Sequence, residues 1–183
     1  MDPFETAPPL DVVEWINAPG GLSLAALTGR VVLLHAFQML CPGCVSHGLP
    51  QASKARAMFA EDDLAVIGLH TVFEHHDVMG AKALKAFVHE YRLTFPIGID
   101  KPGPGPMPLT MQAYALQGTP SLVLIDRQGR VRLNHFGRLE DMVLGALIGQ
   151  LTAEAGNGDA AVQGGEPAQA SDAGCSDKGC AAR

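Results

Sequence analysis

The sequence predicts an α/β fold built on a mixed central sheet. Two stretches, 31–37 and 64–70, are apolar on both faces, as expected of strands in the middle of a parallel sheet. Later in the chain, stretches 121–125 and 131–136 flank the turn sequence 126–130 and predict an antiparallel hairpin. Segments with apolar residues at helical spacing separate the strands, which places helices on both faces of the sheet.

Composition supports one domain and argues against two classes of partner. The 183 residues fit a single domain with a tail, and 47% of them are apolar, which is enough to build a core. The formal net charge is −6 and no run of Lys or Arg occurs, so nucleic-acid binding and attachment to an anionic membrane are both disfavoured. No stretch approaches the roughly 18 apolar residues that a membrane-spanning helix needs.

The expected compartment follows from the first residues of the sequence. They are acidic and rich in proline, and they lack the basic start and the apolar stretch of a secretory signal. We therefore expect a cytoplasmic protein, in which four cysteines point to redox chemistry or metal binding rather than to structural disulfides. No feature of the sequence predicts the oligomeric state.

Turn and breaker residues place the elements along the chain. Residues 11–17 fit either a short strand or a helical turn. The other expected elements are, in chain order, a helical turn at 22–27, a strand at 31–37, a helix from the cysteines to about residue 60, a strand at 64–70, a helix at 80–91, a strand at 95–99, a helix at 109–116, strands at 121–125 and 131–136, and a helix from 139 to about 155. Gly48-Leu49-Pro50 is expected to kink or divide the first long helix, and 101–108, nearly all Pro and Gly, should be irregular. Residues 1–155 form the predicted domain, and 156–183 a flexible tail.

Cys41-Pro42-Gly43-Cys44 is the motif that carries chemistry. It follows a buried strand, and Pro42 suits the first turn of a helix, so Cys41 would sit at a helix N-terminus. Unpaired backbone N–H groups and the helix dipole stabilise a thiolate there, which makes Cys41 the expected nucleophile. Cys44, one helical turn later, could then resolve a mixed disulfide. The alternative is half of a zinc site, but the second cysteine pair lies far away and has the wrong spacing.

The sequence resembles the thioredoxin superfamily over about residues 10–155. Three features carry the resemblance: the apolar strand leading into the Cys41–Cys44 motif, Gly118-Thr119-Pro120-Ser121 just before a strand, and the hairpin that begins at Leu122. Within the superfamily the chain is most similar to the TlpA-like and redoxin branch, related to AhpC/TSA. Members of that branch have an extra β-α unit before the cis-proline, and residues 80–99 occupy that place.

The resemblance implies a three-layer α/β/α sandwich and a thiol–disulfide oxidoreductase. Such a protein reduces or exchanges disulfides of protein or small-thiol partners, is reset by a reductant partner, and needs no cofactor. The resemblance further implies that Pro120 is cis and packs beside the disulfide. Thr119 and Pro120, with Pro42 and Gly43, would then shape the groove for substrate, and the backbone of Thr119 would pair with an extended chain.

The motif departs from the family's usual pattern at three positions. Leu40 replaces a common Trp, Val45 replaces a common basic residue, and His35 stands where relatives have a buried acid or Asn. A neutral imidazole at His35 could relay the proton of Cys44 during resolution, and the alternative is a core histidine hydrogen-bonded to backbone. Peroxidase activity is a less favoured reading, because Gln38 stands three residues before Cys41 and the proline that peroxiredoxins need is absent.

Two further groups of polar residues leave alternatives open. One surrounds the end of the second buried strand and comprises His70, Glu74, His75, His76 and Asp77. Its spacing fits no closed ligand set, so a solvated loop is favoured over a metal site. In the tail, Cys175 and Cys180 could act as a shuttle dithiol, bind a soft metal ion, or do neither. A redox- or metal-sensing module therefore stays the second functional class.

Overall fold

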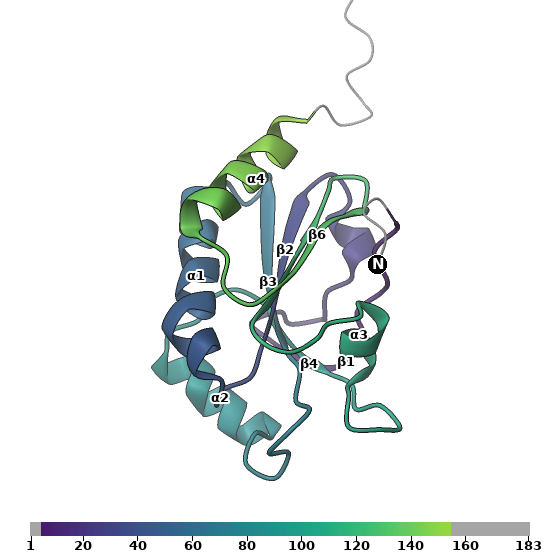
Figure 1. Cartoon of the computed structure of the whole chain (residues 1–183), viewed down its shortest axis with the longest axis vertical. Helices are drawn as coiled ribbons and strands as arrows, with labels where there is room; N and C mark the ends of the chain where they lie inside the picture. The colour runs from purple at the N-terminus through teal and green to yellow at the C-terminus, as the bar shows by residue number, and fades with distance from the viewer. Residues whose placement is uncertain (1–4, 155–183) are drawn as a thin grey trace, which may run out of the picture.

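The structure, a computed structural model, describes residues 5–154. Its centre is a six-stranded mixed sheet (Figure 1). The strands are β1 (Val12–Ile16), β2 (Val31–Phe37), β3 (Leu64–His70), β4 (Ile97–Asp100), β5 (Ser121–Ile125) and β6 (Val131–Phe136). Their order in the sheet is β1-β4-β3-β2-β5-β6. The neighbours β2, β3 and β4 run parallel, whereas β1 pairs with β4, β5 with β2, and β6 with β5 in the antiparallel sense. The predicted mixed α/β sheet is confirmed.

Helices cover both faces of this sheet (Figure 1). They are the 3-10 helix η1 (Leu24–Leu27), the π-helical segment η2 (Cys44–Gly48), α1 (Leu49–Met58), α2 (Ala81–Glu90), α3 (Leu109–Ala113) and α4 (Asp141–Ala153). Residues of α1, α2 and α4 share one core cluster, and residues of η1 and α3 share the other. The result is the three-layer α/β/α arrangement that the family resemblance implies.

Strand β2 lies between these two cores and is fully buried. Val31, Leu33 and Phe37 pack toward α1, α2 and α4, while Val32 and Leu34 pack toward η1 and α3. Alternation along a strand sends successive side chains to opposite faces, so both faces must be apolar when both are covered. The strand is thereby packed on both faces and paired along both edges, and the cysteine motif follows its carboxyl end.

The stretch that the sequence left open, 11–17, is a strand. It forms β1 at the edge of the sheet, and its partner β4 brings Gly98 opposite Trp15. A Cβ atom on Gly98 would lie 2.8 Å from Val12 Cγ2 and 3.2 Å from the Trp15 ring. Glycine on β4 therefore leaves the room that the edge strand needs to pack.

One helix ends earlier than expected, and another is divided where the sequence predicted an irregularity. The helix expected at 109–116 ends at Ala113, because Ala115 adopts a left-handed backbone with φ of 49°. The long helix is not broken at Pro50, which has no N–H to donate. Instead the chain forms the π-helical segment η2 just before it, and the N–H of Leu49 donates to the carbonyl oxygen of Cys44. The helical segment is thus divided between Gly48 and Leu49, within the stretch that was expected to kink or divide it.

The hairpin between β5 and β6 is held by the buried carboxylate of Asp126. Its Oδ1 accepts the backbone N–H groups of Gln128, at 3.0 Å, and Arg130, at 2.9 Å. Its Oδ2 accepts Arg130 Nε at 2.8 Å and Arg132 Nη1 at 3.3 Å. Burial would raise the pKa of this carboxyl, but the hydrogen bonds outweigh burial and lower it.

We predict that Asp126→Asn lowers the free energy of unfolding by about 1–3 kcal/mol at pH 7, because the amide removes a charge and faces N–H donors. Since the folded pKa is depressed, the difference between wild type and variant should be complete above the unfolded pKa and shrink as pH falls through the folded pKa. Urea unfolding from pH 3 to 8 measures it. Exposed Asp62→Asn is the matched control, and equal effects of the two variants would contradict the prediction.

Candidate active site

The two motif cysteines lie at the carboxyl end of β2, where the long helix starts. Cys41 precedes this helix, and Gly43 already has helical dihedral angles of −65° and −32°. The N–H of Cys41 donates to the carbonyl oxygen of Gln38 at 3.2 Å, which turns the chain from strand into helix. Cys41 and Cys44 are at disulfide distance, with their Cα atoms 5.2 Å apart.

The two sulfur atoms have different surroundings. Cys41 is only partly buried, whereas Cys44 is completely buried. The N–H of Cys44 donates to Cys41 Sγ at 3.2 Å, an interaction that favours negative charge on that sulfur. An external disulfide can therefore approach Cys41 and not Cys44. The geometry suits attack by the first cysteine and resolution by the second.

The loop before β5 forms the opposite wall of the site. The peptide bond between Thr119 and Pro120 is cis, as the resemblance implies. Cys41 Sγ lies 3.5 Å from the carbonyl oxygen of Thr119. A Cβ atom on Gly43 would lie 3.5 Å from Pro120 Cδ, so the glycine of the motif packs directly on the proline ring. The structure thus brings together Cys41, Gly43 and the Thr119–Pro120 loop from distant parts of the chain.

His35 lies under the helix that carries the cysteines. Its ring is fully buried, and neither ring nitrogen has a hydrogen-bond partner within residues 5–154. A Cβ atom on Gly48 would lie 2.6 Å from His35 Nε2, so the ring fills the space that this glycine leaves open. Burial lowers the pKa of His35 to about 4, so the imidazole is neutral near pH 7. The backbone hydrogen bond expected of a core histidine is not made.

Gln38 is a site residue whose structural role was not predicted from the sequence. Its side chain is buried between the end of β2 and the loop after β3. Its Oε1 accepts the N–H of Phe73 at 3.4 Å, and its Nε2 donates to Glu74 Oε1 at 3.3 Å. The sequence did show a polar residue, Gln38, between an apolar strand and Cys41. Its hydrogen-bond partner Phe73 could not be inferred, because it lies 35 residues further along the chain.

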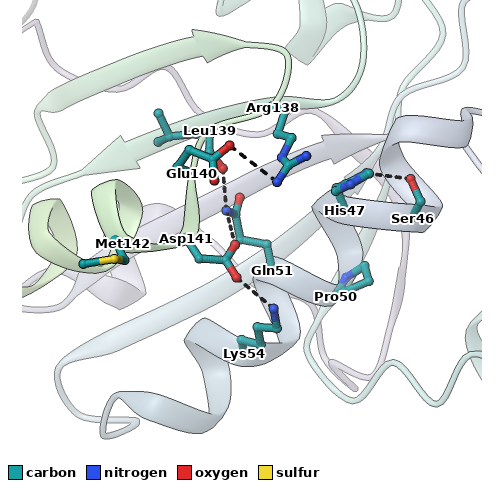
Figure 2. A pocket seen from close by; sticks show the side chains of 10 residues that line it. All are labelled: Ser46, His47, Pro50, Gln51, Lys54, Arg138, Leu139, Glu140, Asp141 and Met142. Atoms are coloured by element: carbon teal, nitrogen blue, oxygen red, sulfur yellow. Dashed lines mark hydrogen bonds and ion pairs between the residues drawn. The ribbon is translucent and has the colours of Figure 1, made fainter.

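A cavity of about 410 Å³ lies beside the motif, between the helix after Cys44 and the loop that joins β6 to α4 (Figure 2). It is lined by Ser46, His47, Pro50, Gln51, Lys54, Arg138, Leu139, Glu140, Asp141 and Met142. Gln51 donates to the carbonyl oxygen of Leu139 and to Asp141, each at 2.7 Å, and Lys54 pairs with Asp141 at 2.8 Å. These contacts fasten the start of α4 to the cysteine-bearing helix. The sequence contained no motif that indicated this cavity.

Other candidate residues are not gathered at the site. Within residues 5–154, no three His, Cys, Asp or Glu side chains come together as a possible metal site, the loop with His75 and His76 included. In the same part of the chain, no helix is long and apolar enough to cross a membrane. Cys175 and Cys180 lie outside the described residues.

Comparison with known proteins agrees with this geometry. The model of the AhpC/TSA family matches residues 6–134, which is more than half of the chain. The chain belongs to the AhpC/TSA family. This member of the family has the fold of thiol–disulfide oxidoreductases, and its Cys41–Cys44 pair is at disulfide distance.

Solved structures and a curated relative give more detail about this AhpC/TSA family member. A thioredoxin-like superfamily protein is 56% identical, with a TM-score of 0.81, over 82% of this chain and 97% of that one. A thiol-disulfide isomerase from Corynebacterium glutamicum is 52% identical, with a TM-score of 0.78, over 81% of this chain and 98% of that one. The thioredoxin-like protein YneN of Bacillus subtilis (strain 168) is 30% identical over 64% of this chain, and the match spans only 62% of YneN.

The contact between His35 and Gly48 can be tested by adding one methyl group. We predict that Gly48→Ala lowers the free energy of unfolding by about 1–3 kcal/mol, because the new Cβ overlaps the His35 ring in a packed interior. Gly145→Ala in α4 is the matched control, since a Cβ there meets nothing within 4 Å. Adding His35→Ala to Gly48→Ala should restore part of the loss in urea unfolding. Strictly additive effects would show that the two side chains do not meet.

Proposed function

We propose that the protein is a thiol–disulfide oxidoreductase that reduces or exchanges disulfides through Cys41 and Cys44. The observation that carries this proposal is the asymmetric cysteine pair beside the Thr119–Pro120 loop. Cys41 is reachable and accepts an N–H bond, Cys44 is buried, and the carbonyl oxygen of Thr119 lies 3.5 Å from the Cys41 sulfur. The isomerase from Corynebacterium glutamicum, at 52% identity over most of both chains, supports the same class of reaction.

In the proposed reaction, two thiols reduce one disulfide. The Cys41 thiolate attacks a sulfur of the substrate disulfide, forming a mixed disulfide and releasing one substrate thiolate, which takes up a proton. The Cys44 thiol then loses its proton and attacks Cys41 Sγ. This step releases the second substrate thiol and closes the Cys41–Cys44 disulfide, so two electrons pass to the substrate. A dithiol reductant of a second protein or a small thiol returns the pair to the reduced state.

His35 is proposed as the acceptor of the Cys44 proton. The ring is neutral near pH 7 because burial holds its pKa near 4, so it has a free nitrogen lone pair. It fits against Gly48, one helical turn beyond Cys44, and both of its nitrogens lack partners within residues 5–154. A neutral imidazole has an unshared electron pair on one nitrogen that can accept a proton, and this ring lies against the helix that carries Cys44.

The substrate is proposed to be an extended polypeptide with a disulfide. Backbone groups of Thr119 border the reactive sulfur, and an extended chain can pair with them as an added strand does. Exposed apolar side chains stand near this border: Leu40 is 58% exposed and Phe136 is 53% exposed. The Phe136 ring packs beside Gly118, next to the same loop. These side chains would contact apolar residues that flank the substrate disulfide.

The reaction is tested by insulin disulfide reduction with dithiothreitol as the reductant. We predict that Cys41→Ser abolishes the protein-dependent rate, because no nucleophile remains at the helix N-terminus. Reduced Cys44→Ser that is mixed with insulin in the absence of dithiothreitol should instead form a mixed disulfide that non-reducing electrophoresis detects, since the resolving thiol is missing. If Cys41→Ser reduced insulin as fast as wild type, the proposal would be wrong. A Cys41-dependent consumption of hydrogen peroxide without insulin reduction would favour a peroxidase.

The role of His35 has its own test. We predict that His35→Asn slows decay of the mixed disulfide by about tenfold or more between pH 6 and 8, because the proton acceptor is lost. The difference in rate between His35→Asn and wild type should become smaller at higher pH, where hydroxide can remove the Cys44 proton. His89→Asn on the exposed surface of α2 serves as the control. A rate–pH profile of His35→Asn that superimposes on that of wild type would leave His35 as a packing residue only.

A further inference from the structure

A second cavity, of about 260 Å³, opens at the carboxyl ends of β3 and β4. Because β2, β3 and β4 are parallel, this is the same edge of the sheet that carries Cys41. The walls are mainly apolar, formed by Val13, Val72, Met79, Ile99, Pro102, Pro106 and Pro108. The lining residues with polar side chains are His70, His76 and Asp100, and Gly80, Ala81, Gly103 and Gly105 complete the wall. Such a cavity, apolar with a few convergent polar groups, is the usual form of a small-molecule site.

The start of helix α2 forms one end of this cavity. Gly80 is the N-cap residue, and Gly80 and Ala81 both line the cavity. Within residues 5–154 no side chain caps the helix, and its first turn contains no acidic residue. The first N–H groups of a helix have no partner inside the helix, and the dipole makes this end positive. An uncapped N-terminus therefore offers donors to an anion.

His70 provides a second, independent indication of a ligand. His70 lines the cavity and is only 1% exposed. Its Nε2 has no hydrogen-bond partner within residues 5–154. Burial lowers the pKa of His70 to about 4, so the ring is neutral and one nitrogen carries a proton that it can donate. A buried imidazole without a partner costs free energy unless something hydrogen-bonds to it.

Asp100 limits which anion fits. Its carboxylate accepts the hydroxyl of Thr71 at 2.9 Å and the N–H groups of Thr110 and Met111 at 2.9 and 3.1 Å. Its oxygens are thus engaged by the protein. Burial raises the pKa of Asp100 although these hydrogen bonds oppose the rise, and the negative charge that the carboxylate carries repels a dianion such as phosphate more than a monoanion. Phosphate would also leave the apolar walls without contacts. A single carboxylate group on an apolar body satisfies both constraints.

We propose that this cavity binds a small organic monocarboxylate. Its oxygens accept hydrogen bonds from the N-terminus of α2 and from His70, and its apolar body packs against Val72, Met79 and Ile99. The site does not use the cysteines, so it stands apart from the proposed oxidoreductase activity. It does adjoin the loop after β3, which Gln38 fastens to the cysteine motif.

Benzoate is the probe, and calorimetry together with amide chemical shifts measures its binding to the full chain. We expect saturable binding that shifts the amide signals of Gly80 and Ala81. Benzyl alcohol, which has the same ring without the charge, should bind at least about tenfold more weakly, since the charge-assisted hydrogen bonds are lost. Inorganic phosphate should bind more weakly than benzoate. Equal affinity for benzoate and benzyl alcohol, or tighter binding of phosphate, would overturn the proposal.

Variants at Gly80 separate binding from folding. A Cβ on Gly80 meets nothing within 4 Å and its φ is −74°, so other residues fit there without strain. Gly80→Asp should raise the melting temperature, because the new carboxylate caps α2, and should weaken benzoate binding at least tenfold by occupying the same donors. Gly80→Ala is the matched control and should bind as wild type does. Benzoate affinity that Gly80→Asp leaves unchanged would refute the site.

Two more variants complete the test. His70→Phe keeps a buried ring of similar shape and should weaken benzoate binding several-fold, because a hydrogen-bond donor is lost. Wild-type affinity in His70→Phe would remove His70 from the site and overturn the proposal as stated. Cys41→Ser should bind benzoate as wild type does whether or not the oxidoreductase proposal holds. Loss of benzoate binding in Cys41→Ser would instead place the ligand at the cysteines.

Discussion

The pairing of β2 with β5 is the constraint on which the candidate active site depends. In this antiparallel pair Ala36 lies opposite Ser121, so the residues that follow β2 meet the residues that precede β5. The cysteine motif is thereby set against the Thr119–Pro120 loop, which the chain reaches only about 80 residues later. Neither segment could build the site alone, because each is an irregular loop whose position comes from the strand that anchors it.

The same constraint accounts for the difference between the two cysteines. The helix that starts at Pro42 leans its buried side on β2, so Cys44 points into the core and Cys41 stays at the rim beside Thr119. The ring of His35, on the core-facing side of β2, occupies the gap left by Gly48. Burial keeps that ring neutral, because a charged imidazole would lose its hydration without gaining a partner. The proposed roles of Cys41 as attacking thiol, Cys44 as resolving thiol and His35 as proton acceptor follow from which of these groups are exposed to water.

The β-α unit formed by α2 and β4 extends the functional edge of the sheet beyond the cysteines. It adds a parallel strand whose carboxyl end carries Asp100, and a helix whose first turn has no cap. The carboxyl ends of parallel strands, together with helix N-termini, commonly form ligand sites in α/β proteins. The cavity at His70 arises from that arrangement, and Gln38 connects its loop to the cysteine motif.

Most of the architecture could be predicted from local patterns. Doubly apolar strands at 31–37 and 64–70 and the hairpin at 121–136 indicated the mixed sheet, since burial on both faces requires such sequences. Boundaries were less predictable: Ala115 ends α3 early by a left-handed turn, and Pro50 is accommodated by a π-helical segment instead of a break. Both depend on the balance of tertiary contacts around one residue, which propensity does not contain.

The sequence by itself predicted thiol–disulfide exchange for the motif, because two cysteines separated by two residues after a buried strand suit that reaction and no second cysteine pair has the spacing of a zinc site. Only the tertiary structure decided the surroundings of that motif. It set Cys41 against the Thr119 carbonyl, buried His35 without a hydrogen-bond partner in the described part of the chain, and joined Gln38 to Glu74. The contacts of Cys41 and Gln38 link residues 36 to 78 positions apart, and their geometry depends on strand pairing and on packing across the sheet, which no local pattern records.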